Sequence, residues 1–383
     1  MRAPPVTRST PPDLHRLGPV GRVTLQTIAD RVGVSRMTVS NAFSKPDQLS
    51  TALREKVLAA ADELGYVGPD PAARALARGT SGAVGILMTD SLSYAFTDEV
   101  STGFLGAIAD ELAPTGLALT LLASTVRGDK VPARDVPMDG ALVYSCGLDS
   151  TAVDWLIRRG LPIVYVDQIP VPGIPSINVD DMGGARAAAQ HLVDLGHRRV
   201  AIVNHEPGVA HEVVAAGIGG KHVSHQRQLG WLEPLEAAGI EPVIVEAAGW
   251  IVDETTGERR NHDDALVLAT RELLQRDDGP TAILCFSDVM AFRVVRIAQE
   301  LGLRVPEDLS VIGFDDSPLA SRMHPALTTV RQDIRAKGRA AAAALTAAIE
   351  GARTGNKPSR AKRVLLPTEL VVRDSTAPPR GRR

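Results

Sequence analysis

The chain has 383 residues, more than one compact core usually carries, so we expect two or three structural units. Hydrophobic residues make up 44% and charged residues 23%, which excludes a disordered or fibrous protein. No apolar run reaches the roughly 18 residues of a membrane-spanning helix, and no apolar export segment is present, so we expect a cytoplasmic protein without a membrane partner. Cys146 and Cys285 are too few for a disulfide framework, and their apolar surroundings predict buried, inert thiols.

Charge divides the chain into two regions. Residues 1–80 hold eleven Lys or Arg and seven Asp or Glu, so this region carries +4, whereas the remainder carries −7. Local positive charge suits a phosphate-binding surface, because each neutralised phosphate releases counterions. A chance fluctuation of surface charge is the alternative on these numbers alone. Residues 1–22 are rich in Pro and Arg and predict a disordered arm.

Residues 23–67 predict a small bundle of three helices. Thr24 can cap a first helix that ends at Gly33, Ser35 can cap a second, and a third over 50–64 closes the core. The outward face of the second helix is polar apart from one methionine and consists of Arg36, Met37, Thr38, Ser40 and Asn41. Two short helices joined at a glycine turn predict a helix-turn-helix whose second helix fits the major groove.

The run Val23–Asn41 resembles the DNA-reading head of the lactose/galactose repressor (LacI/GalR) family, and the resemblance continues through Arg54–Val57, Glu63–Val67 and Ala73–Leu76. It implies that the base-edge contacts are Arg36, Met37 and Asn41. It implies that the phosphate or backbone contacts are Thr24, Ser35, Thr38 and Ser40. One departure is Thr27, where the family often has Asp, and we expect it to affect only the local cap or packing.

Residues 68–80 form the linker to the rest of the chain. Pro71 can begin a helix, because its missing N–H falls among the donors left free at a helix N-terminus. By resemblance this hinge helix orders on the operator and pairs with its twin in the minor groove, where it inserts Leu76 between base pairs, with Ala73 as a second contact. A plain tether between domains is the alternative.

Residues 81–374 predict a two-lobed α/β body, because short apolar runs alternate with helical patterns and the order repeats in the second half. The expected strands are 83–88, 117–123, 141–144, 163–167, 200–204, 243–246, 282–286 and 310–314. This alternation is typical of two parallel, doubly wound sheets in tandem, with a ligand cleft at the carboxyl ends of the strands. The predicted fold class is an all-α helix-turn-helix head with a hinge helix, followed by a periplasmic-binding-protein-like α/β core.

Motifs of the same family recur in order through the body, at Val179–Gly184, Gly196–Val200, Arg227–Gly230, Leu303–Asp316 and Leu327–Gln332. The resemblance implies a transcription regulator, usually a repressor, that binds a pseudo-palindromic operator as a homodimer and is controlled allosterically by a small molecule. It places dimer contacts on the helix over 98–112 and on the elements after residue 83. The tail over 375–383 is predicted to be disordered, and its lack of heptad leucines favours a dimer over a tetramer.

The candidate effector-binding residues at expected strand ends are Arg227, Trp250 and Asp315. Asp315 can accept two hydrogen bonds, Arg227 can donate a planar pair, and Trp250 can stack on a sugar or a base ring. The weaker candidates are Tyr94, Phe96 and Ser287, the last standing where the family usually has Asn. A sugar or sugar derivative is the default effector, although a purine would use the same groups. The alternatives are an interlobe or core ion pair for the two charged residues and simple packing for the tryptophan.

Two long segments, 204–226 and 249–262, flank the expected pocket and leave the identity of the effector open. The first contains His205, His211, His222 and His225, which raise a metal hypothesis. No carboxylate or cysteine stands at tight ligand spacing beside them, so titratable loop residues are the better account, and no metal or cofactor is predicted. His197 is expected to be a structural turn residue.

The sequence contains no nucleophile elbow, P-loop or dinucleotide-binding fingerprint, so we expect no enzyme. A solute-binding protein with the same two lobes is the alternative function, because it would explain the body equally well. It leaves the head unexplained.

Overall fold

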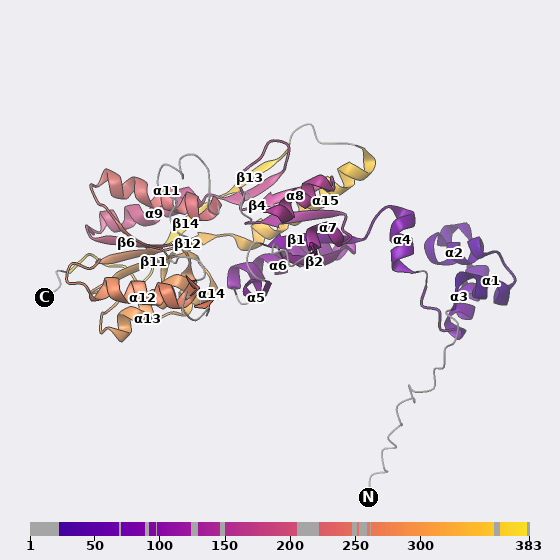
Figure 1. The fold of residues 1–383 in the computed structure, drawn as a ribbon, viewed down its shortest axis with the longest axis horizontal. Helices are drawn as coiled ribbons and strands as arrows, with labels where there is room; N and C mark the ends of the chain where they lie inside the picture. The colour runs from indigo at the N-terminus through magenta and orange to yellow at the C-terminus, as the bar shows by residue number, and fades with distance from the viewer. Residues whose placement is uncertain are drawn as a thin grey trace, which may run out of the picture. The chain divides into compact units, whose positions relative to one another are not determined.

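The structure is a computed structural model that divides into two compact units, Met1–Ser81 and Gly82–Arg383 (Figure 1). It describes residues 23–380 except 69, 89–91, 97, 124–128, 146–149, 205–221, 247–250, 253–258, 261 and 356–360. The predictions for the arm over 1–22 and for Cys146 therefore lie outside the described residues. None of the helices in the described part combines the length and the apolar character that crossing a membrane requires.

The first unit contains the predicted helical bundle and a separate linker helix. Its helices are α1 (Leu25–Val32), α2 (Arg36–Ser44), the 3-10 turn η1 (Pro46–Gln48), α3 (Thr51–Glu63) and α4 (Pro71–Arg78). The predicted caps are confirmed, since the hydroxyls of Thr24 and Ser35 accept the backbone N–H groups of Thr27 and Thr38. Thr27 completes a capping box, because its hydroxyl accepts the N–H of Thr24 at 3.2 Å. The departure from the family pattern at this position therefore keeps the first turn capped.

The second unit contains two six-stranded sheets with helices packed around them, which confirms the predicted fold class. The first sheet has the order β13-β5-β4-β3-β1-β2 and is parallel throughout. Its strands are β1 (Ala83–Met88), β2 (Ala118–Ala123), β3 (Gly140–Tyr144), β4 (Ile163–Val166), β5 (Ser176–Val179) and β13 (Arg363–Leu366). The helices of this lobe are α5 (Leu92–Ala95), α6 (Glu99–Leu112), the 3-10 turn η2 (Ala113–Thr115), α7 (Pro132–Asp135), α8 (Thr151–Arg158) and α15 (Ile334–Thr354).

The second sheet has the order β14-β12-β11-β10-β6-β7 and is parallel except for β14, which runs antiparallel to β12. Its strands are β6 (Val200–Asn204), β7 (Val243–Glu246), β10 (Ala282–Cys285), β11 (Ser310–Asp315), β12 (Thr328–Gln332) and β14 (Thr368–Val371). The helices of this lobe are α9 (Asp181–Asp194), α11 (His222–Ala237), α12 (His262–Gln275), α13 (Asp288–Glu300) and α14 (Pro318–Arg322). A short antiparallel pair, β8 (Ile251–Val252) and β9 (Arg259–Arg260), forms a separate ribbon.

The chain passes between the two lobes three times, so the lobes are not simply the two halves of the sequence. It leaves the first lobe after β5, returns after β12 to form α15 and β13, and leaves again to form β14. α15 packs against α6 and against β3, β4 and β5 of the first sheet. The prediction of two parallel sheets is confirmed, but the strictly tandem arrangement is wrong from residue 334 onward.

The carboxy-terminal segment differs from the predicted disordered tail, because residues 375–380 are placed against the second lobe. The Ser375 hydroxyl donates to Val311 O at 2.6 Å and accepts the N–H of Thr328 at 2.8 Å. The carbonyl of Ala377 lies 3.0 Å from His197 Nε2, whose ring also contacts Thr281 and Ser310. His197 is thus a buried structural residue that binds the tail.

Close packing of α9 and α11 depends on a glycine of the Arg227–Gly230 motif. A Cβ atom on Gly230 would lie 2.3 Å from the carbonyl oxygen of Met182 and 2.8 Å from Ala185 Cβ, both of α9. Since a backbone atom cannot move aside cheaply, Gly230→Ala is expected to lower the free energy of unfolding by about 1–3 kcal/mol. Denaturant titration measures this, with the exposed Glu236→Ala of the same helix as the matched control. Equal stability of the two variants would contradict the packing argument.

Candidate functional site

The first candidate site is the outer face of α2. Val39 and Ala42 turn into the core of the head, whereas Arg36 is exposed and Met37 is 69% exposed. Thr38 is half-buried and its hydroxyl lies 2.9 Å from that of Ser35, so both take part in the cap of the helix. The exposed pair at the first turn therefore offers one side chain with a planar set of donors and one apolar side chain to an edge of a base pair.

Asn41 lies one turn further along α2 and is held by a residue that sequence reasoning missed. Its amide Nδ2 donates to Gln48 Oε1 of η1 at 3.1 Å. This bond restricts the orientation of the Asn41 amide. The Ser40 carbonyl accepts the hydroxyl of Ser44, and the Ser40 side chain is half-buried.

The linker forms a helix as predicted, because α4 begins at Pro71 and ends at Arg78. Leu76 is 87% exposed on this helix, and Ala73 is exposed as well. Most of the large apolar side chain of Leu76 is open to solvent in a single chain. It is therefore available for contact with another surface.

The second candidate site lies in the body, where backbone strain marks the carboxyl ends of three strands. The residues other than glycine with positive φ in the described chain are Ser145 (51°), Asp167 (52°), Asp315 (112°) and Asp316 (52°). They end or directly follow β3, β4 and β11. Such backbone conformations are costly and collect at functional sites, and the ends of parallel strands are where α/β folds bind ligands.

Arg227 of α11 lies at the centre of the polar groups at these strand ends. Its Nε donates to Asp181 Oδ1 at 2.8 Å, its Nη1 donates to the carbonyl of Phe286, and its Nη2 lies 3.4 Å from Asp315 Oδ1. The guanidinium carbon is 3.5 Å from the ring centroid of Phe314 and 4.6 Å from that of Phe286. Two carboxylates and two aromatic rings therefore fix this side chain.

A continuous row of hydrogen bonds connects Arg227 to the other lobe. Gln332, at the end of β12, donates to Asp315 Oδ1 at 2.7 Å and accepts from Lys337 Nζ at 2.9 Å. Lys337, on α15, also forms a 2.6 Å ion pair with Asp167 Oδ2 at the end of β4. We call Asp167, Asp181, Arg227, Asp315, Gln332 and Lys337 the strand-end cluster. It joins the ends of strands from both sheets.

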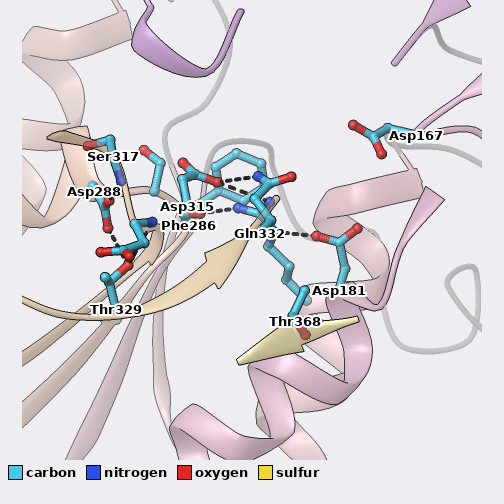
Figure 2. A network of polar contacts seen from close by, with 12 residues as sticks. Asp167, Asp181, Phe286, Asp288, Asp315, Ser317, Thr329, Gln332 and Thr368 are labelled. Carbon is cyan, nitrogen blue, oxygen red and sulfur yellow. Dashed lines mark hydrogen bonds and ion pairs between the residues drawn. The ribbon is translucent and has the colours of Figure 1, made fainter. Parts of the chain in front are cut away.

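A further carboxylate borders the strand-end cluster. Asp288, at the first turn of α13, accepts the hydroxyl of Thr329 and the N–H of Ser317, the latter at 2.7 Å. Figure 2 shows Asp288 and Thr329 on one side of Asp315 and Gln332, and Asp181 on the other. Four carboxylates are therefore buried within one region around two cations.

Burial is the largest influence on the protonation of these carboxylates. It raises the pKa of Asp181 to about 6, although Arg227 acts in the opposite direction. Burial likewise raises the pKa of Asp315 to about 7, again against Arg227. The pKa of Asp288 is raised to about 8 by burial and by the neighbouring charge of Asp315. Titratable groups with such shifted pKa values are typical of binding sites.

Several polar atoms of this region are buried without a hydrogen-bond partner among the described residues. They include Asp167 Oδ1, the amide nitrogen Nε2 of Gln168 and the hydroxyl oxygen of Ser317. A buried polar atom without a partner costs about 1–3 kcal/mol, so such atoms indicate where a bound molecule would supply the missing bond.

The structure brings together two of the predicted effector residues, Arg227 and Asp315, as a buried ion pair. Ser287 instead caps α13, since its hydroxyl accepts the N–H of Met290 at 3.3 Å. Phe96 is 63% exposed just after α5. The side chain of Tyr94 and the whole of Trp250 lie outside the part of the chain that the structure describes.

Sequence reasoning missed Lys337, although the sequence contains a signal for it. The buried stripe of α15 consists of Lys337, Gly338, Ala341, Ala342 and Leu345. One lysine on an otherwise small and apolar stripe is the residue that needs a carboxylate partner.

The metal hypothesis gains no support from the described chain, where no group of three or more His, Cys, Asp or Glu is placed to hold a metal ion. His205 and His211 lie outside the described residues. His222 and His225 belong to the first turn of α11, and burial lowers the pKa of both.

Two family models match the chain. Residues 24–68 match the bacterial regulatory proteins of the lacI family, and residues 189–376 match the periplasmic binding protein-like domain. The HTH-type transcriptional regulator IpsA of Corynebacterium glutamicum is 35% identical over 82% of this chain and 88% of its own length.

Two solved structures resemble the whole chain. One is the transcriptional regulator CelR–cellobiose complex, with 29% identity, a TM-score of 0.64 and coverage of 92% of this chain and 100% of that one. The other is the lac repressor dimer bound to operator and an anti-inducer, with 27% identity, a TM-score of 0.69 and coverage of 93% and 99%. The head, the body and these matches agree: the chain belongs to the bacterial LacI family and is a DNA-binding transcriptional regulator.

Proposed function

We propose that this regulator is a repressor that binds a pseudo-palindromic operator as a homodimer and releases or gains DNA when a sugar or sugar derivative binds between its lobes. The observation that carries the effector site is the set of buried polar atoms at the strained strand ends that have no partner among the described residues. The chain acts as a regulator and not as an enzyme. Its place of action is the cytoplasm, where the operator DNA lies.

The DNA-binding part of the proposal assigns base contacts to Arg36, Met37 and Asn41. The phosphate and backbone contacts in this proposal are Thr24, Ser35, Thr38 and Ser40. The exposure of Arg36 and Met37 on α2 supports the base contacts. The hydrogen bond from Asn41 to Gln48, which orients the Asn41 amide, supports them as well. The pair of α4 helices in a dimer would contact the minor groove through Ala73 and Leu76, where an inserted leucine bends the DNA. The solved lac repressor dimer, which is bound to operator, supports binding of DNA by a dimer.

The effector part of the proposal places a polyhydroxyl compound against the strand-end cluster. Hydroxyl groups can donate to carboxylates and accept from Arg227, and aromatic residues such as Tyr94, Phe96 and Trp250 would cover apolar ring faces. The cellobiose complex of CelR supports a sugar as the class. Ser287, as the cap of α13, would contribute through the position of Asp288.

Effector binding would reach the DNA through the three chain crossings between the lobes. The Gln332 side chain sits at one of them and touches both Asp315 of one lobe and Lys337 beside the other. A ligand that binds one arrangement of the lobes more tightly shifts the population toward it, and operator affinity changes by that free-energy difference.

Selection of bound DNA from a random pool tests the proposal. The full-length protein should enrich one pseudo-palindromic site at a stated salt concentration, and a version without residues 1–78 should enrich none. No enriched site for the full-length protein would leave two candidates: a regulator that needs its effector to bind DNA, and a solute-binding protein of the same two-lobed fold.

Arg36→Ala is expected to weaken binding to the selected operator by about 1–3 kcal/mol while binding to unrelated DNA changes far less. The reason is that a guanidinium that pairs with a guanine edge loses sequence-specific bonds, whereas a lost phosphate contact weakens all DNA equally. Fluorescence anisotropy with both DNAs measures the two affinities. Arg31→Ala is the matched control, because it also removes one arginine charge from the head. Arg31 lies on α1 and forms an exposed ion pair with Glu63. Equal losses on both DNAs for Arg36→Ala would remove its base-reading role.

A further inference from the structure

We propose that the strand-end cluster rejects anionic molecules, so that the effector is an uncharged compound bearing hydroxyl groups and its phosphate esters and carboxylates are excluded. This inference rests on the proposed function, because it takes the strand-end cluster to be the effector site. It adds the charge class of the ligand, which decides between a free sugar and a phosphorylated one.

Both buried Lys or Arg side chains of the described chain are already paired with carboxylates. Lys337 is 1% exposed, and its Nζ lies 2.6 Å from Asp167 Oδ2. Arg227 is 3% exposed and lies between Asp181 at 2.8 Å and Asp315 at 3.4 Å, with aromatic rings over its guanidinium. A phosphate group is best neutralised by an unpaired cation, and both cations of the strand-end cluster are already paired with carboxylates.

The charge count points the same way. The four carboxylates of Asp167, Asp181, Asp288 and Asp315 share two cations, so the cluster has no positive charge in excess. The imidazole of His222 adds no charge at neutral pH, because burial lowers its pKa against the influence of Asp167. Proton uptake by some of the carboxylates removes negative charge, but it creates no cation. An incoming anion would therefore be buried without a cation of the described cluster to neutralise it, which is unfavourable because burial removes its hydration.

The unsatisfied atoms beside the ion pair suit a hydroxyl group. Asp167 Oδ1 is a buried acceptor without a partner, and the next residue, Gln168, has a buried amide Nε2 without one, among the described residues. A hydroxyl can donate to the first and accept from the second. A phosphate dianion or a carboxylate has no hydrogen to donate to Asp167, so it would leave this oxygen unsatisfied.

Asp167 also controls the charge of the site, because it neutralises Lys337. Asp167→Asn keeps the shape of the side chain but leaves the ammonium group without its ion pair. The variant should bind the neutral effector more weakly. Its preference for the neutral effector over the phosphate ester should fall at least about tenfold. Asp278→Asn makes the same formal change at an exposed pair with Arg276 and is the matched control.

The experiment begins with a small-molecule extract of the cells that express the regulator, separated by anion exchange into an uncharged and an anionic fraction. Each fraction is tested for a rise in the thermal unfolding midpoint of the full-length protein and for a change in operator affinity. The active compound is then compared with its own phosphate ester. We expect activity in the uncharged fraction and at least about 100-fold weaker binding of the ester, because a buried charge without a partner carries a large desolvation cost.

The outcomes separate the two proposals. Activity only in the anionic fraction would overturn the charge selectivity and leave the effector site standing. Activity in neither fraction would overturn the effector site itself and this inference with it. If Asp167→Asn does not fold, Asp167→Asn with Lys337→Met restores the charge balance, and this double variant should still reject the ester while binding the neutral compound more weakly. Unchanged binding of the neutral compound by either variant would remove Asp167 from the site.

Discussion

Arg227→Met is expected to lower the free energy of unfolding of the body by about 3–5 kcal/mol at pH 8. Methionine keeps much of the arginine volume and its contact with Phe314, but Asp181 and Asp315 then remain buried without their shared cation. The loss is large because removal of one partner leaves uncompensated buried charge, which costs more than the ion pair contributes. Denaturant unfolding followed by tryptophan fluorescence or circular dichroism measures it.

The matched control is Arg276→Met, which breaks an exposed ion pair with Asp278. Water screens such a pair, so we expect no measurable change in stability. If both variants unfold at the same denaturant concentration, the buried position of Arg227 has no energetic importance and the cluster is not held together by charge.

The loss should also depend on pH, and its sign follows from the raised pKa values. In the wild-type protein Asp315 titrates near 7 instead of its ordinary 3.8, so its contribution to stability is full below 3.8 and is lost as pH rises toward 7. Without the arginine the two carboxylates hold their protons to a still higher pH. The difference between variant and wild type should therefore shrink as pH falls from 8 to 5.

Truncation after Arg373 is the second change with a large expected effect, a loss of roughly 3–6 kcal/mol of unfolding free energy. It removes the Ser375 carbonyl, which accepts the N–H of Val311 at 2.9 Å, and the Ser375 hydroxyl, which accepts the N–H of Thr328. It also removes the carbonyl that pairs with His197. The buried N–H groups of Val311 and Thr328 then lack acceptors, which costs about 1–3 kcal/mol each, and the ring of His197 loses one of its partners. The thermal unfolding midpoint and denaturant unfolding both report the change.

Truncation after Ala377 is the control for this prediction, because it keeps every one of these bonds and removes only the residues beyond them. If the tail were disordered, neither truncation would change the free energy of unfolding. A large loss in the shorter chain alone would show that the tail completes the second lobe.

Much of the fold could be predicted because its physical causes are local. The central strands are buried on both faces and so form short apolar runs, and Thr24, Ser35 and Ser50 each accept a backbone N–H at the start of a helix. β13 and β14 are mostly half-exposed and carry charged residues, so their composition does not single them out. The tail, with its Ser, Thr and Pro residues, resembles a disordered segment, and only tertiary bonds to Ser310 and His197 order it.

The site was predictable where chemistry coincides with strand position. Asp315 ends β11, close to the predicted strand end, whereas the prediction of a strand end is wrong for Arg227, which lies on α11; the structure nevertheless brings the two together. Asp167 ends a predicted strand without any motif, and Lys337 comes from a helix far along the chain that returns to the first lobe. Their pairing depends on a chain crossing that the alternation of strands and helices does not reveal.

The three crossings also constrain the order in which the protein can mature on the ribosome. The head contains all of its own core residues within 23–66, so it can fold and meet DNA as soon as it emerges. Each lobe instead waits for late residues, since the first needs α15 and β13 and the second needs β14 and Ser375. A nascent chain would therefore carry a folded DNA-binding head attached to two incompletely folded lobes. Any binding to the operator in this interval would not respond to the effector.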